Sequence, residues 1–242
     1  MRRLFLFAPL LLLYCTLVTL AVTEHHRCIS DTVALRAGPT MSMDIFMKIT
    51  EKRQAQITRF AQDQPLPAVR EEQVGEGWKP IRIKLVTGTL KRDGHYCGEK
   101  GNKNPIITLL NKEYTCTDDD VLTPEKEHIL VKEILPEAIK LHEERLFVEP
   151  LKGPIVVPQF SKNDGLCYKF ISQDKEREKS FAADMVLFVA AEPTPEETFA
   201  WAATCATLGP DGRPVVGIIN YGPRYIVATP QRVRVAAHEI AH

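Results

Sequence analysis

The sequence His238-Glu239-Ile240-Ala241-His242 has the residue types and spacing of a metal-dependent hydrolase. Residues four apart lie on one face of a helix, so His238 and His242 can offer two imidazoles to one Zn²⁺ ion. Glu239 would then lie beside a zinc-coordinated water and accept its proton during attack on a peptide carbonyl. The pattern predicts a zinc peptidase site with His238 and His242 as ligands and Glu239 as the catalytic base and acid.

A helix is predicted to carry these residues. Thr229-Pro230 has the form of an N-cap followed by proline at the first helical position, where its missing N–H is harmless. The apolar residues that follow recur at spacings of three and four, as in a helix packed on a core. A catalytic zinc normally has three protein ligands. Nothing follows His242 in the sequence, so we expect the third ligand to be absent from this chain.

Four segments upstream have clear periodicity. Residues 81–86 alternate like a half-buried strand, and 185–190 and 215–220 are apolar runs typical of buried strands. A long amphipathic helix is predicted from Thr123-Pro124 to Leu146, with a kink or break at Pro136. A strand followed by the zinc helix suggests a sheet edge beside a cleft, where substrate could add as a further strand. His128 and His142 flank the long helix and are expected to be surface histidines.

Composition and the amino-terminal region set further limits. The chain of 242 residues has 31 basic and 31 acidic residues and no basic run interleaved with aromatics, which argues against nucleic acid as a partner. Met1-Arg2-Arg3 and the apolar stretch 4–22 have the layout of a secretory signal, with cleavage near Ala21. An uncleaved membrane anchor is the alternative, because the run approaches the ~20 residues that span a bilayer.

Residues 23–73 are polar and suggest a pro-segment or linker. Within them one helix is plausible between residues 43 and 60, and Asp63-Gln64-Pro65-Leu66-Pro67 is an extended break. The folded domain is expected to begin near Trp78.

The cysteine count indicates an oxidising compartment. Of six cysteines, Cys15 lies in the expected signal, which leaves an odd number afterwards. Four would pair and one would remain, and Cys28, isolated near the new amino terminus, is the natural odd one. The sequence alone leaves the pairings open. Bridges between nearest neighbours, Cys97 to Cys116 and Cys167 to Cys205, would close loops of moderate length.

Nearly the whole chain resembles the leishmanolysins, the zinc metalloproteases of peptidase family M8. The residues that carry this resemblance are His26-Arg27-Cys28 with Asp31, Trp78, Arg82-Ile83, His95-Tyr96-Cys97, Cys116-Thr117, Leu122-Thr123, Leu141-His142, Glu144-Arg145-Leu146, Trp201-Ala202, Thr204-Cys205, Val216-Gly217, Ile219-Asn220 and His238-Glu239. Together they are more specific than the zinc pentapeptide.

The resemblance implies an α+β, zincin-like amino-terminal subdomain, in which a twisted mixed sheet and long helices end in the zinc-binding helix. Residues 1–21 would be the signal peptide, 22–75 a pro-segment, and 76–242 the subdomain, incomplete at its carboxyl end. Cys28 would act as a cysteine switch that occupies the zinc, with an unpaired leftover thiol as the alternative. The resemblance also implies the disulfides Cys97–Cys116 and Cys167–Cys205.

The expected function is therefore a zinc-dependent metalloendopeptidase of proteins and peptides, made as a zymogen and either secreted or held at the cell surface. The family's later histidine ligand, methionine turn and cysteine-rich region do not occur in the sequence, so we expect this chain by itself to bind zinc weakly and to be nearly inactive. Two alternatives are a non-catalytic secreted binding or adhesion module and an inhibitor that acts in trans through Cys28.

Overall fold

A computed structural model describes residues 26–37, 41–42, 77–91, 96–98, 105–172, 174–208 and 212–242. The expected signal peptide, most of the expected pro-segment, the helix expected between residues 43 and 60, and His95 lie outside these ranges.

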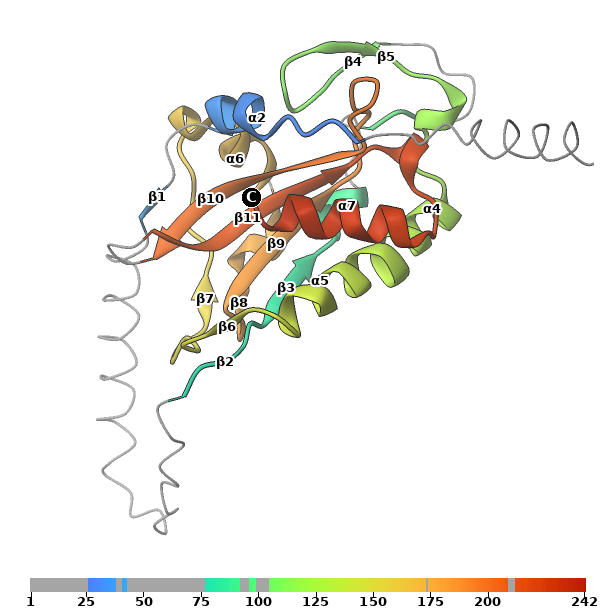
Figure 1. Ribbon diagram of the computed structural model, residues 1–242. Helices are drawn as coiled ribbons and strands as arrows, with labels where there is room; N and C mark the ends of the chain where they lie inside the picture. Colours follow the sequence, from blue (N-terminus) through green and yellow to red (C-terminus); the bar gives the residue numbers. More distant parts are fainter. Residues whose placement is uncertain are drawn as a thin grey trace, which may run out of the picture.

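A five-stranded mixed sheet forms the centre of the fold, in the order β1-β10-β11-β9-β3 (Figure 1). Strands β10 and β11 are antiparallel, and the other neighbouring pairs are parallel. The strands are β1 (Met41–Ser42), β3 (Ile83–Val86), β9 (Met185–Ala190), β10 (Ala200–Leu208) and β11 (Arg213–Tyr221). The mixed sheet with helices agrees with the α+β class expected from the sequence.

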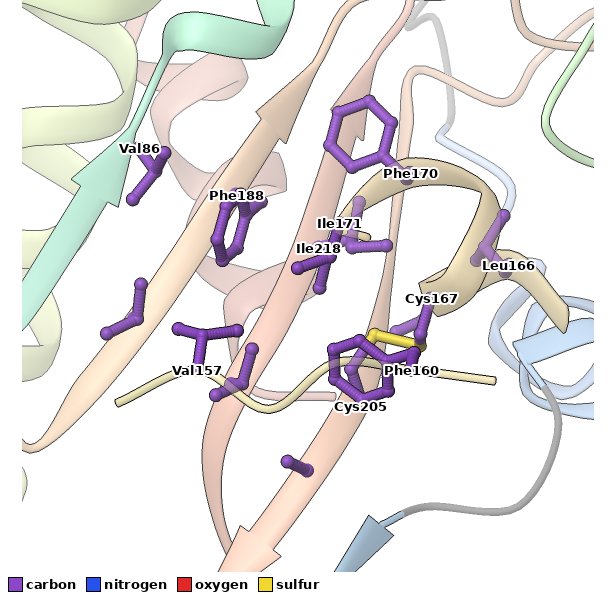
Figure 2. Packing of buried hydrophobic residues seen from close by; sticks show 14 of the residues in the cluster. Val86, Val157, Phe160, Leu166, Cys167, Phe170, Ile171, Phe188, Cys205 and Ile218 are labelled. Atoms are coloured by element: carbon purple, nitrogen blue, oxygen red, sulfur yellow. A yellow bond between two sulfur atoms is a disulfide. The ribbon is translucent and has the colours of Figure 1, made fainter. Parts of the chain in front are cut away.

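Strand β9 is buried on both faces because helices cover both sides of the sheet. Its side chains alternate between two cores, as the period of two in a strand requires. Val186 and Phe188 pack with α6, whereas Leu187 and Val189 pack with α5 and α7. Figure 2 shows the first core, in which Phe188 and neighbouring strands meet Phe170.

Helices on the two faces belong to different parts of the chain. The first core contains α2 (Ser30–Ala37) and α6 (Gly165–Phe170). The second contains α5 (Leu135–Glu143) and α7 (Pro230–Ile240), and α4 (Pro124–Ile129) leads into it. Helix α7 therefore lies across the sheet beside α5, on the opposite face from α2 (Figure 1).

The expected break at Pro136 takes the form of a π-helical turn, η3 (Leu130–Ile134), between α4 and α5. Proline has no N–H to donate to the carbonyl four residues earlier, so the turn before it widens. The Leu135 N–H accordingly donates to the carbonyl of Leu130, five residues back. Helix α5 ends at Glu143, and Leu146, which was expected on the apolar face, is 44% exposed.

Short elements complete the described fold. Three two-stranded ladders join β2 to β6, β4 to β5 and β7 to β8. Their bounds are β2 (Lys79–Pro80), β4 (Pro105–Ile107), β5 (Glu113–Thr115), β6 (Phe147–Val148), β7 (Ile155–Val156) and β8 (Ser180–Phe181). The 3₁₀ turns are η1 (Gly88–Lys91), η2 (Asp118–Asp120), η4 (Lys162–Asp164), η5 (Lys175–Glu178) and η6 (Pro223–Tyr225).

The structure contains the Cys97–Cys116 and Cys167–Cys205 disulfides. The second joins α6 to β10 across the first core (Figure 2). Within the described ranges, no helix has the length and apolar character to cross a membrane.

The strand that precedes the zinc helix is internal, which differs from the edge position expected from the sequence order. Strand β11 lies between β10 and β9, and α7 contacts both β10 and β11. Among the described residues, the short strand β1 pairs with the other side of β10 at Ala206 and Thr207. No strand was predicted over residues 200–208, because this alanine-rich segment has weak β-propensity.

Glu192 connects the β4–β5 hairpin to the sheet. The Leu109 N–H donates to Glu192 Oε2 at 2.5 Å, and the Glu192 N–H donates to Asn220 Oδ1 at 2.7 Å. Burial raises the pKa of the Glu192 carboxyl to about 8, against the opposing effect of the Leu109 hydrogen bond. An unfolded glutamate titrates near 4.3, so the folded state binds more protons than the unfolded state between about pH 4 and pH 8.

We predict that Glu192→Gln weakens the pH dependence of stability. In the wild type, the contribution from Glu192 is complete below about pH 4 and is lost as pH rises to about 8. Glutamine does not titrate, so the Tm of the variant relative to wild type should rise by at least ~2–4 °C between pH 5 and pH 9. Glu113→Gln, at an exposed carboxyl of the same hairpin, is the control for thermal melts. Parallel Tm profiles for wild type and Glu192→Gln would contradict this account.

Candidate metal centre

Helix α7 presents the predicted zinc residues at its carboxyl end. The Thr229 hydroxyl accepts a hydrogen bond from Arg232 N–H and Pro230 occupies the first turn, as predicted from the sequence. Val235, Ala236 and Ile240 are buried in the second core. That burial fixes the rotation of the helix and leaves the His238 side chain 51% exposed.

His238 and His242 come together at the end of this helix. Their Nε2 atoms are 3.2 Å apart, and their rings meet edge to face. His242 lies beyond the last helical residue, but its N–H donates to the carbonyl of Glu239 at 3.1 Å. The Thr204 hydroxyl of β10 also donates to the carbonyl oxygen of His242 at 3.4 Å. These contacts hold the second histidine although the regular helix has ended.

Cys28 supplies a third donor at the same point. Its Sγ is 3.3 Å from His242 Nε2, and the donor atoms of Cys28, His238 and His242 lie within 4.8 Å of one another. Tetrahedral zinc has bonds of about 2.0–2.1 Å to nitrogen and about 2.3 Å to sulfur, which place two nitrogens about 3.3 Å apart and nitrogen and sulfur about 3.6 Å apart. The observed separations are close to both values, so the three residues fit a zinc ion.

Glu239 is fully buried next to these donors. Its Oε1 is 4.0 Å from His238 Nε2 and accepts a hydrogen bond from His26 Nε2 at 2.6 Å. The other oxygen, Oε2, is buried without a hydrogen-bond partner in the described part of the chain. A buried carboxylate oxygen without a donor carries a free-energy penalty, and a water molecule or a reacting group at the site would relieve it.

His142 positions α7 from the neighbouring helix. Its Nε2–H donates to the carbonyl of Ala237 at 2.9 Å, one residue before the first zinc histidine. The prediction that His142 is a surface histidine is wrong, because His142 is partly buried between α5 and α7. A cavity of about 780 Å³ also lies between these helices, but neither His238 nor His242 lines it.

The loop that leads into α7 is held by an ion pair. Arg224 in η6 donates to both carboxylate oxygens of Asp120 at 2.8 Å, and its NH2 group also contacts Tyr114 Oη. Burial would raise the pKa of the Asp120 carboxyl, but hydrogen bonds from Arg224 and Thr117 outweigh it and lower that pKa. Burial raises the pKa of the Tyr114 phenol to about 12. The network keeps the entry to α7 in one position.

The structure therefore gathers His238, Glu239, His242 and Cys28, and it leaves the four disulfide cysteines away from the metal donors. No role for His26 was predicted from the sequence. The feature that could have indicated one is its spacing of two from Cys28, because residues two apart in an extended chain lie on the same side. His26 and Cys28 accordingly both reach α7.

Comparison with known proteins identifies relatives of this chain. A family model described as leishmanolysin, Peptidase_M8, matches residues 16–242. Leishmanolysin of Leishmania major is 31% identical over 226 residues, covering 92% of this chain and 35% of that protein. Leishmanolysin of Leishmania amazonensis is 34% identical over 168 residues, covering 68% of this chain and 27% of that protein. A leishmanolysin homolog of Crithidia fasciculata is 33% identical over 172 residues, covering 68% of this chain and 25% of that protein. The chain spans about a quarter to a third of the length of these curated relatives.

We predict that Cys28, His238 and His242 bind one divalent ion together. Co²⁺ should give a tetrahedral visible spectrum with a thiolate charge-transfer band, and Cys28→Ser should abolish that band and weaken affinity by about tenfold or more. His238→Ala should weaken binding further. His128→Ala removes an exposed histidine of α4 and serves as the control. A Co²⁺ spectrum unchanged by Cys28→Ser would exclude the thiol as a ligand.

Proposed function

Because the chain belongs to the leishmanolysin family of peptidases, we propose that it carries the catalytic glutamate and two zinc ligands of a metalloendopeptidase. The observation that carries the proposal is the pair of imidazole nitrogens 3.2 Å apart beside a buried glutamate. His238 and His242 would hold the zinc. Proteins and peptides would be the substrates.

A bound zinc ion lowers the pKa of its coordinated water to about 7 and polarises the carbonyl of the scissile bond. With zinc held by His238 and His242, Glu239 would be the group that accepts a proton from the attacking water and donates it to the leaving amine. Its position suits both transfers, since Oε2 has no donor in the described residues and Oε1 is within 4.0 Å of His238 Nε2. His242, the second ligand, accepts a hydrogen bond from the Thr204 hydroxyl and donates its N–H to the Glu239 carbonyl. These bonds hold His242 close to the Glu239 carboxylate.

Strand β10 would bind the substrate backbone. Within the described residues, β1 pairs with β10 at residues 206–207, and no described strand pairs with the same side of β10 at residues 200–205. Extended peptides add to such an edge through main-chain hydrogen bonds, which are indifferent to side-chain identity. This contact would place the scissile carbonyl near the end of α7 for many different peptide sequences.

The same site would be latent while residues 26–28 lie on it. Cys28 Sγ lies 3.3 Å from His242 Nε2, where it would take the coordination position that a catalytic zinc leaves for water. The expected pro-segment would thus act as a cysteine switch. The two disulfides are consistent with a protein that matures in an oxidising compartment, so we place it in the secretory pathway, released or associated with the cell surface.

We predict that Glu239→Gln removes hydrolysis without removing zinc. The assay uses the variant His26→Ala/Cys28→Ala, which lacks the His26 and Cys28 side-chain contacts to α7. Because two histidine ligands are expected to bind zinc weakly and to support slow hydrolysis, the variant is kept in excess zinc and at high concentration over a quenched-fluorescent casein. Adding Glu239→Gln should lower kcat/KM by about 10²–10⁴-fold, the usual contribution of a general acid and base. Glu125→Gln, at an exposed position of α4, is the matched control.

Two outcomes would contradict the proposal. Full hydrolysis by zinc-loaded protein carrying Glu239→Gln would exclude the assigned role of Glu239. No hydrolysis by zinc-loaded His26→Ala/Cys28→Ala protein would exclude catalysis by this chain and favour the non-catalytic binding module.

A further inference from the structure

We propose that His26 is a second inhibitory residue of the segment at the site, one that binds the catalytic carboxylate and does not need the metal. The inference rests on the proposed function, in which Glu239 is the catalytic base. Cys28 would act on the zinc position and His26 on Glu239, so the segment blocks two different groups through side chains two residues apart.

The hydrogen bonds of His26 define its tautomer. The Phe199 backbone N–H donates to His26 Nδ1 at 3.1 Å. A ring nitrogen that accepts carries no proton, so in the neutral ring the proton is on Nε2. Nε2–H therefore donates to Glu239 Oε1, at 2.6 Å. The His26 side chain is 10% exposed and that of Glu239 is fully buried, so water competes little for this bond.

The same tautomer argues against His26 as a zinc ligand. His26, His238 and Glu239 also lie close enough together to hold a metal ion. Coordination through Nε2 would move the proton to Nδ1, where it would meet the Phe199 N–H, a second donor. The Phe199 contact thus favours a role for His26 as a hydrogen-bond donor to Glu239.

Two aromatic rings lie beside the His26 imidazole. The centroid of the His26 ring is 5.4 Å from that of Phe199 and 6.0 Å from that of His238. The Phe199 ring is itself fixed by the Arg232 guanidinium, 3.9 Å from its centroid, and by Tyr225 at 4.5 Å. His26 therefore packs against Phe199, the residue before β10, and against His238 of α7.

The backbone of the segment explains why His26 and Cys28 act together. The Arg27 N–H donates to the carbonyl of Glu197 at 2.6 Å, in the turn that precedes β10. This bond holds the backbone between the two contacts, His26 with Glu239 and Cys28 with His242. The Arg27 side chain is exposed.

Removing the metal distinguishes the contact of His26 from that of Cys28. Without zinc, the exposed Cys28 thiol keeps its 3.3 Å contact with His242 Nε2 but has no bond through an ion, whereas the His26 bond to Glu239 is unchanged and shielded from water. Metal-free protein should therefore keep residues 26–28 docked, and losing His26 should release them.

The test is residue-resolved amide hydrogen exchange in EDTA-treated protein. His26→Ala should accelerate exchange at the Phe199 and Arg27 amides by about tenfold or more, as expected for loss of a hydrogen bond to a charged group. Arg27→Ala keeps its own N–H and should leave the Phe199 amide unchanged. His26→Gln retains an N–H donor for Glu239 and should restore part of the protection at Arg27.

A second measurement needs no substitution. Imidazole ¹⁵N spectra of metal-free wild type should show His26 protonated at Nε2 and unprotonated at Nδ1. The opposite tautomer, or equal exchange in wild type and His26→Ala, would overturn the proposal while leaving zinc binding and hydrolysis untouched. A failure of zinc binding would remove the proposed function and leave these spectra unchanged.

Inhibition itself is measured by adding zinc. The variant His26→Ala/Cys28→Ala should hydrolyse casein about tenfold faster than Cys28→Ala, because Cys28→Ala leaves Glu239 bonded to His26. Equal rates for two active variants would exclude an inhibitory role for His26.

Discussion

Helix α7 must bury one face in the second core while keeping two imidazoles and a carboxylate at a common point. Burial of Val235, Ala236 and Ile240 sets the rotation of the helix, and the geometry of the zinc donors follows from that rotation. The surrounding contacts serve the same constraint. His142 holds the helix from α5, Arg224 holds its entry through Asp120, and Thr204 of β10 holds His242 just beyond its end.

The sequence predicted the parts of this arrangement that are local. The cap at Thr229, the buried strand 185–190 and the interruption near Pro136 each depend on neighbouring residues, and each is present. The mixed sheet and the pairing of Glu239 with two histidines were also foreseen. The edge strand β10 was not, because alanines in a strand are specified by packing on both faces and by pairing with β11 rather than by propensity.

The contacts that the sequence did not reveal join distant segments. The spacing of His26 and Cys28 suggests that they share one side of the chain but not what they contact, and no local pattern marks His142. Each histidine is placed by a hydrogen bond to α7. Only the assembled fold brings these residues to the helix. Residues 238–242 therefore indicate the chemistry by themselves, whereas the three-dimensional structure shows which other residues control access to the site.

The bond between His26 and Glu239 spans 213 residues of sequence. Loop-closure entropy grows only with the logarithm of length, so a segment tethered at this distance behaves as a ligand held at high effective concentration. Once the connecting chain is cut, that advantage is lost, and the segment stays only as long as its own contacts hold it. These contacts include Val33 of α2 in the first core, so release of residues 26–28 from the site is coupled to the packing of that core.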